Sequence, residues 1–244
     1  MIVELLDFMP DSLRSFVRRQ HYKRLVARFD LDREPDLRMA LDLVRRGDCV
    51  IDIGANIGIW SMVLSKQVGD SGRILAVEPF PATFGILKSI TASKENIVLC
   101  NAAMSDSEGT TRMMLGDDGR GHKNHYLAAI HDGPGGTSVR KTTLDLTVRE
   151  RGLQPHFIKI DAEGHELFII RGGLRTIEEC RPILCIEIQS DLNSRRSDGA
   201  QIRRMLEDID YEVQVREGRR LRPRTPADAA VNYFFLPREL RASA

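Results

Sequence analysis

From Cys49 to about residue 190, short runs of apolar residues alternate with segments of helical character. Most of these runs are apolar on both faces, which is typical of strands buried in a parallel sheet between two layers of helices. A repeating strand–helix series of this kind folds as an open, doubly wound α/β sheet. The pattern predicts strands at 50–54, 74–78, 97–102, 157–161 and 183–188, and helices at 58–67, 81–93, 164–180 and 198–209.

The remaining segments complete a single-domain plan. Two further apolar runs, 211–217 and 232–237, have no helix between them and are expected to pair as an antiparallel hairpin at the end of the sheet. Residues 116–137 contain six glycines and three histidines, which predicts a long mobile loop, followed by a strand at 138–143 and a helix at 144–151. We therefore expect a helical N-terminal extension at 1–46, with helices before and after Pro35, and one Rossmann-like domain at 47–244.

Composition narrows the class of protein. Lys and Arg number 36 against 35 Asp and Glu, and this balance argues against a protein that coats nucleic acid by bulk attraction. The four cysteines form no CxxC pair, as expected of reduced thiols in the cytoplasm. The N-terminus lacks the basic start of a signal peptide, and the longest uncharged stretch, 53–65, is too short to span a bilayer. A cytoplasmic location is the expectation.

The turn after the first predicted strand carries the first functional signal. Gly54 and Gly58 allow the backbone to approach a ligand closely where a helix N-terminus offers free N–H groups. The sequence does not match the GxGxxG dinucleotide motif or the P-loop motif, because it lacks residues that each motif requires. Asp52 instead precedes the first glycine, and a carboxylate there suits an amino group or hydroxyls. The alternative is an ordinary strand-to-helix turn with Asn56 as a cap.

Glu78 carries the second signal because it ends the second predicted strand, 24 residues after Gly54. In nucleotide-binding α/β folds an acid at this place accepts hydrogen bonds from both ribose hydroxyls. Pro79 ends the strand and holds the carboxylate at the carboxyl edge of the sheet. The alternative is a solvated glutamate at the end of a strand.

Ionisable residues crowd the end of the strand at 157–161, and another acid ends the neighbouring strand. Such a cluster can supply acid–base or substrate-orienting groups, or oxygen ligands for a divalent cation. For Glu163 and Glu166, which precede and begin the following helix, the alternative role is to cap that helix. The residues concerned are Lys159, Asp161, Glu163, His165, Glu166 and Glu187.

These motifs together resemble the FkbM family of class I S-adenosylmethionine-dependent methyltransferases. The resemblance rests on GANIG, AVEP, the run from Asn101 to Asp106, TTLD at 142–145, KIDAEGHE and the final IE, and it covers about residues 47–190. It implies a Rossmann-like, seven-stranded, mostly parallel sheet and O-methylation of sugar or polyketide hydroxyls.

The resemblance also implies roles for individual residues. Around S-adenosylmethionine, Asp52, Gly54, Asn56 and Gly58 would line the methionine part, Glu78 the ribose, and Asn101 and Ala102 the adenine, with Asp161 beside the donor methyl.

The proton of the acceptor hydroxyl needs a base, and two residues are candidates. His165 belongs to the residue type that ordinarily titrates near neutral pH, whereas Asp161 is better placed at the end of its strand. Glu187 is expected to orient the acceptor and Glu163 to contact it. No resident metal is expected.

Two groups of cations lie outside the matched region. Six Lys or Arg and no acid lie between Asp11 and Asp30, so this helix either docks an apolar stripe on the domain or a second subunit, or meets a membrane or an acidic partner. The second group consists of five arginines in the terminal hairpin. They are either solvated or reach an acidic acceptor, with Arg219 and Arg220 as the binding residues. These five arginines are Arg216, Arg219, Arg220, Arg222 and Arg224.

The predicted activity is O-methylation of a small molecule, such as a sugar or glycan, a secondary metabolite or a polysaccharide precursor. RNA or protein methylation by the same fold is the alternative, and it is disfavoured because aromatic residues are few, at 6%. NAD-dependent reduction is disfavoured by the unmatched GxGxxG. No nucleic-acid partner is expected, and the N-terminal helices offer a route to a homo-oligomer.

Overall fold

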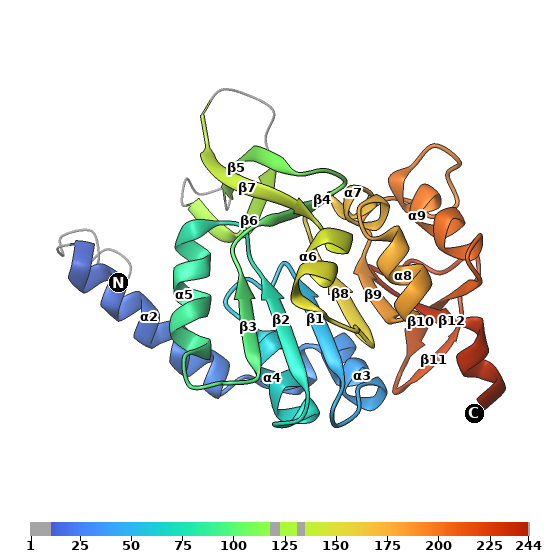
Figure 1. The fold of residues 1–244 in the computed structure, drawn as a ribbon, viewed down its shortest axis with the longest axis horizontal. Helices are drawn as coiled ribbons and strands as arrows, with labels where there is room; N and C mark the ends of the chain where they lie inside the picture. The colour runs from blue at the N-terminus through green and yellow to red at the C-terminus, as the bar shows by residue number, and fades with distance from the viewer. Residues whose placement is uncertain (1–10, 118–122, 131–134, 244) are drawn as a thin grey trace.

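The computed structural model describes residues 11–117, 123–130 and 135–243, and its main feature is an eight-stranded sheet in the order β11-β10-β12-β9-β8-β1-β2-β3 (Figure 1). Strands β3, β2, β1, β8 and β9 are parallel to one another, as the alternating pattern predicted. The bounds are β1 Cys49–Ile53, β2 Arg73–Val77, β3 Ile97–Cys100, β8 Phe157–Ile160, β9 Ile183–Glu187, β10 Tyr211–Glu217, β11 Arg220–Pro223 and β12 Asn232–Pro237.

The end of the sheet is antiparallel, as predicted, with β12 inserted between β9 and β10. One strand is additional to the expected seven. The segment after β10 turns back at Gly218 and pairs as β11 along the edge of the sheet. A four-residue edge strand rich in arginine carries no apolar signal, and for that reason the sequence pattern did not reveal it.

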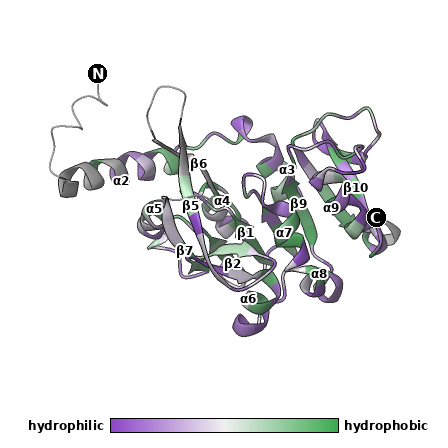
Figure 2. Ribbon diagram, turned by 90° about the horizontal axis from the view of Figure 1, so that it is seen from above, coloured by the Kyte–Doolittle hydropathy of each residue, from purple (hydrophilic) through white to green (hydrophobic). Residues whose placement is uncertain are grey.

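Helices cover both faces of the sheet (Figure 2). Alternate residues of a strand such as β1 point to opposite faces. Ile51 and Ile53 pack in one cluster with the helices that follow β7 to β9, whereas Val50 packs in the other cluster with the helices near the N-terminus. The first layer contains α6 Leu144–Arg151, α7 Glu166–Arg171, α8 Leu174–Cys180 and α9 Asp198–Glu207; the second contains α3 Pro35–Leu43, α4 Ile59–Val68 and α5 Pro81–Thr91.

Strands of a second, four-stranded sheet occupy half of the segment predicted as a loop at 116–137. Its order is β4-β7-β5-β6, and β5 and β6 form an antiparallel hairpin above the main sheet (Figure 1). Three of the six glycines that suggested a loop are described, and they lie at irregular points of this sheet: Gly116 follows the register shift of β5, and Gly135 and Gly136 precede β7 with positive φ. His122 and His131 lie outside the described residues. The bounds are β4 Ala103–Ser105, β5 Gly109–Asp117, β6 Lys123–Ile130 and β7 Thr137–Thr143.

The N-terminal segment contains α2 Asp11–Ala27, the 3-10 turn η1 Leu31–Arg33 and α3. Val26 and Tyr22 of α2 pack on Ile57, Ile86 and Ile90. The apolar stripe of α2 therefore docks on its own domain, while the cations Lys23, Arg24 and Arg28 are exposed.

The second N-terminal helix is shorter than expected, because α3 ends at Leu43 and leaves Arg45 and Arg46 beyond it. The short 3-10 turn η2 Arg238–Ser243 ends the described chain. Within residues 11–117, 123–130 and 135–243, no helix has the length and apolar character needed to cross a membrane.

Candidate active site

A cavity of about 350 Å³ opens at the carboxyl ends of the parallel strands, where open α/β sheets bind their ligands. Two groups of residues line it. The β2 side is formed by Gly54, Asn56, Glu78 and Ala102, which follow β1, β2 and β3. The β9 side is formed by Glu34, Asp161, Glu163, Glu187 and Asn232, which come from the N-terminal segment, β8, β9 and β12.

The glycine turn after β1 is held by the neighbouring strand. The N–H groups of Gly54 and Ala55 both donate to the carbonyl oxygen of Val77, at 3.0 and 2.9 Å. Gly54 has a φ of 78°, and a Cβ there would collide with the backbone carbonyl oxygen of Asp161. Gly58, at φ 90°, begins α4, and a Cβ there would lie 2.7 Å from Cδ1 of Leu87. Both glycines are thus required by the protein's own packing.

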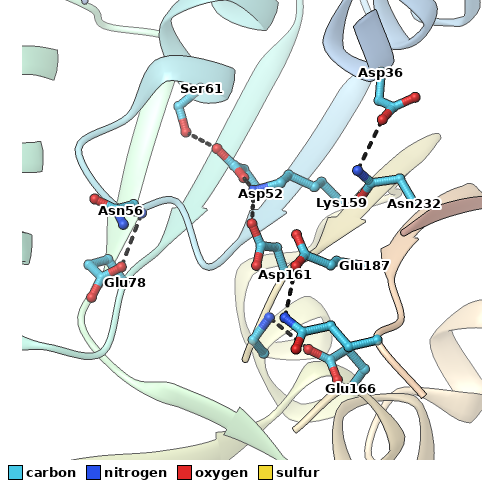
Figure 3. A network of polar contacts seen from close by, with 12 residues as sticks. Asp36, Asp52, Asn56, Ser61, Glu78, Lys159, Asp161, Glu166, Glu187 and Asn232 are labelled. Atoms are coloured by element: carbon cyan, nitrogen blue, oxygen red, sulfur yellow. Dashed lines mark hydrogen bonds and ion pairs between the residues drawn. The ribbon is translucent and has the colours of Figure 1, made fainter. Parts of the chain in front are cut away.

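Glu78 lies at the centre of the β2 side and is almost completely buried, with 5% of its surface exposed. Its carboxylate accepts hydrogen bonds from the N–H groups of Asn56, at 3.0 Å, and Phe80, at 2.9 Å (Figure 3). These two bonds fix the orientation of the carboxylate against the turn. Burial outweighs them and raises the pKa of Glu78 from 4.5 to about 7.

A buried ion cluster connects the two sides beneath the cavity. The strand register places Asp52 of β1 beside Lys159 of β8, and their carboxylate and ammonium groups lie 3.8 Å apart. Lys159 also binds Asp161 at 3.1 Å and lies over the ring of Trp60 (Figure 3). Burial disfavours the ammonium form of Lys159, but the two carboxylates outweigh it and raise its pKa above the ordinary value.

Asp52 is positioned differently from what the resemblance implied. It is completely buried and is not among the residues that line the cavity. One carboxylate oxygen accepts a hydrogen bond from the Ser61 hydroxyl at 2.6 Å, whereas Oδ1 has no hydrogen-bond partner. The reason is the alternation along β1, which points Asp52 to the face that α4 covers. Burial raises the pKa of Asp52, although Lys159 and Ser61 oppose the shift.

The β9 side is strongly acidic. Glu163, in a left-handed backbone conformation at φ 49°, and Glu187 face the same space as Asp161. Burial raises the pKa of Glu163 and of Glu187, and the nearby Asp161 carboxylate raises both further. Glu34, from the segment before α3, joins them, and burial likewise raises its pKa.

Two other predicted residues are held by specific contacts. His165 lines the cavity at the start of α7, where its Nε2 lies 2.9 Å from the Ser105 hydroxyl and its ring stacks on Phe168. Glu166 is buried and accepts hydrogen bonds from the N–H groups of Ala162 and Gly164. Glu166 therefore stabilises the turn after β8, which agrees with the capping alternative.

Several predicted site residues do not line the cavity. Asn101 donates from its side-chain amide to the carbonyl oxygens of Glu78 and Pro79 and so supports the loop after β2. Arg219 and Arg220 are exposed in the turn from β10 to β11. Five predicted site residues therefore lie outside the lining of the cavity: Asp52, Gly58, Asn101, Arg219 and Arg220. In the same patch, Arg216 pairs with the carboxylate of Asp36, and Arg222 pairs with the carboxylates of Glu217 and Asp228.

The sequence motifs missed part of the lining. Glu34 and Asn232 belong to no motif, and only the closure of the fold brings them to the cavity. Trp60, Met104, Met113 and Ile130 form apolar walls. Ile130 of β6 lies in the segment where a loop was expected, whereas Met113 of β5 precedes that segment and Met104 of β4 belongs to the run from Asn101 to Asp106.

A model of the "Methyltransferase FkbM domain" matches residues 52–213, which is more than half of the chain. The chain belongs to the FkbM methyltransferase family. No curated protein matches it in sequence. The cofactor of this family's methyltransferase domain is S-adenosyl-L-methionine, as the motifs implied.

Three solved structures are similar to the chain, and the one with a TM-score above 0.5 shares the fold. Fibrillarin from Aeropyrum pernix, with natively bound S-adenosyl-L-methionine, is 14% identical over 82% of this chain and 73% of its own, with a TM-score of 0.51. An FkbM methyltransferase from Methylobacillus flagellatus is 17% identical, with a TM-score of 0.49 and coverage of 92% of this chain and 60% of that one. A methyltransferase from Aquifex aeolicus is 14% identical, with a TM-score of 0.46 and coverage of 89% and 96%. The chain thus spans 60% of the length of the FkbM methyltransferase from Methylobacillus flagellatus.

The residues of the β2 side fit S-adenosylmethionine. Glu78 presents a buried, fixed carboxylate of the kind that accepts ribose hydroxyls. Asn56 contributes a side-chain oxygen that is buried without a hydrogen-bond partner among the described residues. The carboxylates of the β9 side suit a neighbouring sulfonium, which carries a positive charge. In the described part of this FkbM-family chain, no group of three or more acids, histidines or cysteines is arranged to hold a metal ion.

The affinity of S-adenosylhomocysteine for this FkbM-family protein is expected to rise about tenfold between pH 6 and pH 8. Glu78, with a pKa of about 7, is mostly protonated at the lower pH and ionised at the higher, and the ionised form is the better acceptor for two hydroxyls. Isothermal titration calorimetry at the two pH values measures the change, and Glu78→Gln should bind weakly with no such slope. Equal affinity of the wild type at both pH values would contradict the prediction.

Proposed function

We propose that the protein is an S-adenosylmethionine-dependent O-methyltransferase acting on a hydroxyl of a small molecule, such as a sugar or glycan, a secondary metabolite or a polysaccharide precursor. Family membership supports methyl transfer. The observation that carries the proposal is that one cavity is lined on one side by Glu78, a carboxylate suited to the ribose of a nucleoside, and on the other side by a group of acids from β8 and β9.

S-adenosylmethionine supplies an electrophilic methyl group on its sulfonium when it is bound. The residues of the chain have to align the acceptor oxygen and remove its proton as the new bond forms. We assign the base to Asp161, whose partly exposed carboxylate faces the cavity and is held by Lys159 at 3.1 Å. His165 has its Nε2 in contact with the Ser105 hydroxyl, which suits it to orient the acceptor or to act as the alternative base.

Glu187 and Glu163 then contact other hydroxyls or polar groups of the acceptor. Glu187 is itself fixed by a hydrogen bond from the Gln189 amide at 3.1 Å. The apolar wall of Met104, Met113 and Ile130 covers the cavity from the second sheet and limits the access of water. The enzyme thereby separates donor binding on one side from acceptor binding on the other.

The test has two stages. Calorimetry should first show binding of S-adenosylhomocysteine to the wild type. Release of S-adenosylhomocysteine from S-adenosylmethionine is then measured against sugars, nucleotide sugars, hydroxylated metabolites and an RNA oligonucleotide. With the acceptor found, Asp161→Asn should lower kcat at least 100-fold while leaving the affinity for S-adenosylhomocysteine within about threefold.

Three results would contradict the proposal. The first is that the wild type fails to bind S-adenosylhomocysteine, and the second is that the methyl group is transferred to RNA only. The third is that Asp161→Asn and His165→Ala both retain normal turnover. Glu150→Gln, a substitution of an exposed acid on α6, serves as the control that should change neither measurement.

A further inference from the structure

The β9 side holds more negative charge than the protein neutralises. Four carboxylates line it: Glu34, Asp161, Glu163 and Glu187. Lys159 is the one Lys or Arg among the described lining residues of the whole cavity, and it already pairs with Asp161 at 3.1 Å and with Asp52 at 3.8 Å. The group therefore carries an excess of acid facing the position of the acceptor.

An independent observation in the floor of the cavity leads to the same conclusion. Asp52 is completely buried, and its Oδ1 has no hydrogen-bond partner, so Lys159 is the cation on which this carboxylate depends. The ammonium group is thus shared between two acids, one of which is cut off from solvent. Lys159 lowers the pKa of Glu34 and of Glu187 only in part, because burial and neighbouring carboxylates still raise both.

The acids are held in place and do not simply turn to solvent. Asp36, two residues after Glu34, accepts hydrogen bonds from Arg216 at 2.6 Å and from Asn232 at 3.0 Å, and these bonds tie the segment to β10 and β12 (Figure 3). Glu187 is held by Gln189. In each of the three glutamates burial raises the pKa, and neighbouring carboxylates raise it further. Such carboxylates are stabilised by a cation that enters the cavity.

We infer that the acceptor carries a protonated amine close to the hydroxyl that is methylated, and that Glu34, Glu163 and Glu187 bind this ammonium group. The inference rests on the proposed function and names its substrate class: hydroxylated amines, amino sugars among them. The sulfonium of the donor offsets part of the excess charge and the ammonium group another part. An anionic acceptor, which the exposed Arg219 and Arg220 suggested, is repelled by the same acids.

The test uses matched probes on the protein saturated with S-adenosylhomocysteine. Amino sugars, aminocyclitols and hydroxyalkyl amines are each paired with their N-acetylated form, and binding is measured by calorimetry at pH 7 in two buffers of different ionisation enthalpy. At least one amine is expected to bind ten or more times more tightly than its N-acetyl partner and to be the better methyl acceptor. Its binding should release protons, because the ammonium group lowers the pKa of the glutamates, and should weaken as salt is added.

Substitutions locate the effect. Glu163→Gln and Glu187→Gln are each expected to weaken binding of the amine about tenfold, and to weaken binding of the N-acetyl partner by less than about threefold. Glu150→Gln, the same change on the exposed face of α6, should alter none of these.

The outcomes separate the two proposals. The inference alone is overturned if the protein binds S-adenosylhomocysteine but gives one of three results. It shows equal affinity for both members of every pair, or it prefers a phosphorylated or uronic acid probe, or it binds no amine. Absence of S-adenosylhomocysteine binding would overturn the proposed function and the inference with it. Thermal unfolding of each variant shows that a lost affinity does not reflect a lost fold.

Discussion

Replacing Lys159 with methionine is expected to lower the free energy of unfolding by about 3–5 kcal/mol, because it leaves a buried charge without its partner. Asp52 has no exposed surface, and Lys159 is the cation that lies 3.8 Å from it. Asp161, at 3.1 Å from the ammonium group, loses its partner as well. Urea unfolding followed by circular dichroism at pH 7 measures the loss.

Two further variants make this prediction specific. Lys88→Met, on the exposed face of α5, should change stability by less than about 0.5 kcal/mol. Adding Asp52→Asn to Lys159→Met should restore a large part of the loss, because the uncompensated charge is then absent. The single variant should also become more stable as the pH falls, since burial raises the pKa of Asp52 and the folded state takes up the proton first. A double variant as unstable as the single one would refute the explanation.

The substitution Gly54→Ala is expected to destabilise the protein by about 3 kcal/mol or more, or to prevent folding. The added Cβ would collide with the backbone carbonyl oxygen of Asp161, and the φ of 78° is itself unfavourable for alanine. Neither strand can move aside, because β1 and β8 are paired in the core from Val50 to Ile53. Urea unfolding of the purified variant, or its absence from the soluble fraction, reports the effect.

Gly85→Ala is the matched control. Gly85 lies exposed within α5, and a Cβ there meets nothing within 4 Å. Alanine in place of glycine inside a helix stabilises by about 0.5–1 kcal/mol, so the control should shift in the opposite direction. A Gly54→Ala protein as stable as the wild type would show that the turn after β1 relaxes in a way that the packing does not suggest.

The parallel strands β1, β2, β3, β8 and β9 were predictable, because strands buried on both faces carry an unmistakable pattern of apolar residues. The β5–β6 hairpin was not predictable by the same means, since its strands are interrupted by Gly116 and mix polar and apolar residues. The edge strand β11 was also missed, because an exposed edge has no apolar requirement. Sequence periodicity reports burial, and none of the four residues of β11 is buried.

The site was predicted in the same uneven way. Residues that follow a buried strand, such as Glu78, Asp161 and Glu187, line the cavity because the ends of parallel strands meet at one edge. Asp52 lies within its strand, and the alternation of side chains turns it towards α4. The close approach of Gly54 to a ligand stays a prediction, and in the structure the carbonyl oxygen of Asp161 lies where a Cβ of residue 54 would be.

The bonds from Asp36 to Arg216 and Asn232 join parts of the chain that are 180 and 196 positions apart. Both Glu34 and Asn232 lie outside residues 52–213, the region that the family model describes. The wall that we propose to face the acceptor is therefore built in part by segments that carry no family motif, while the turn that we propose to bind the donor lies within the matched region. Changes at the two flanks can alter which molecule is methylated and leave the handling of the methyl donor intact, so relatives with the same motifs are free to differ in substrate.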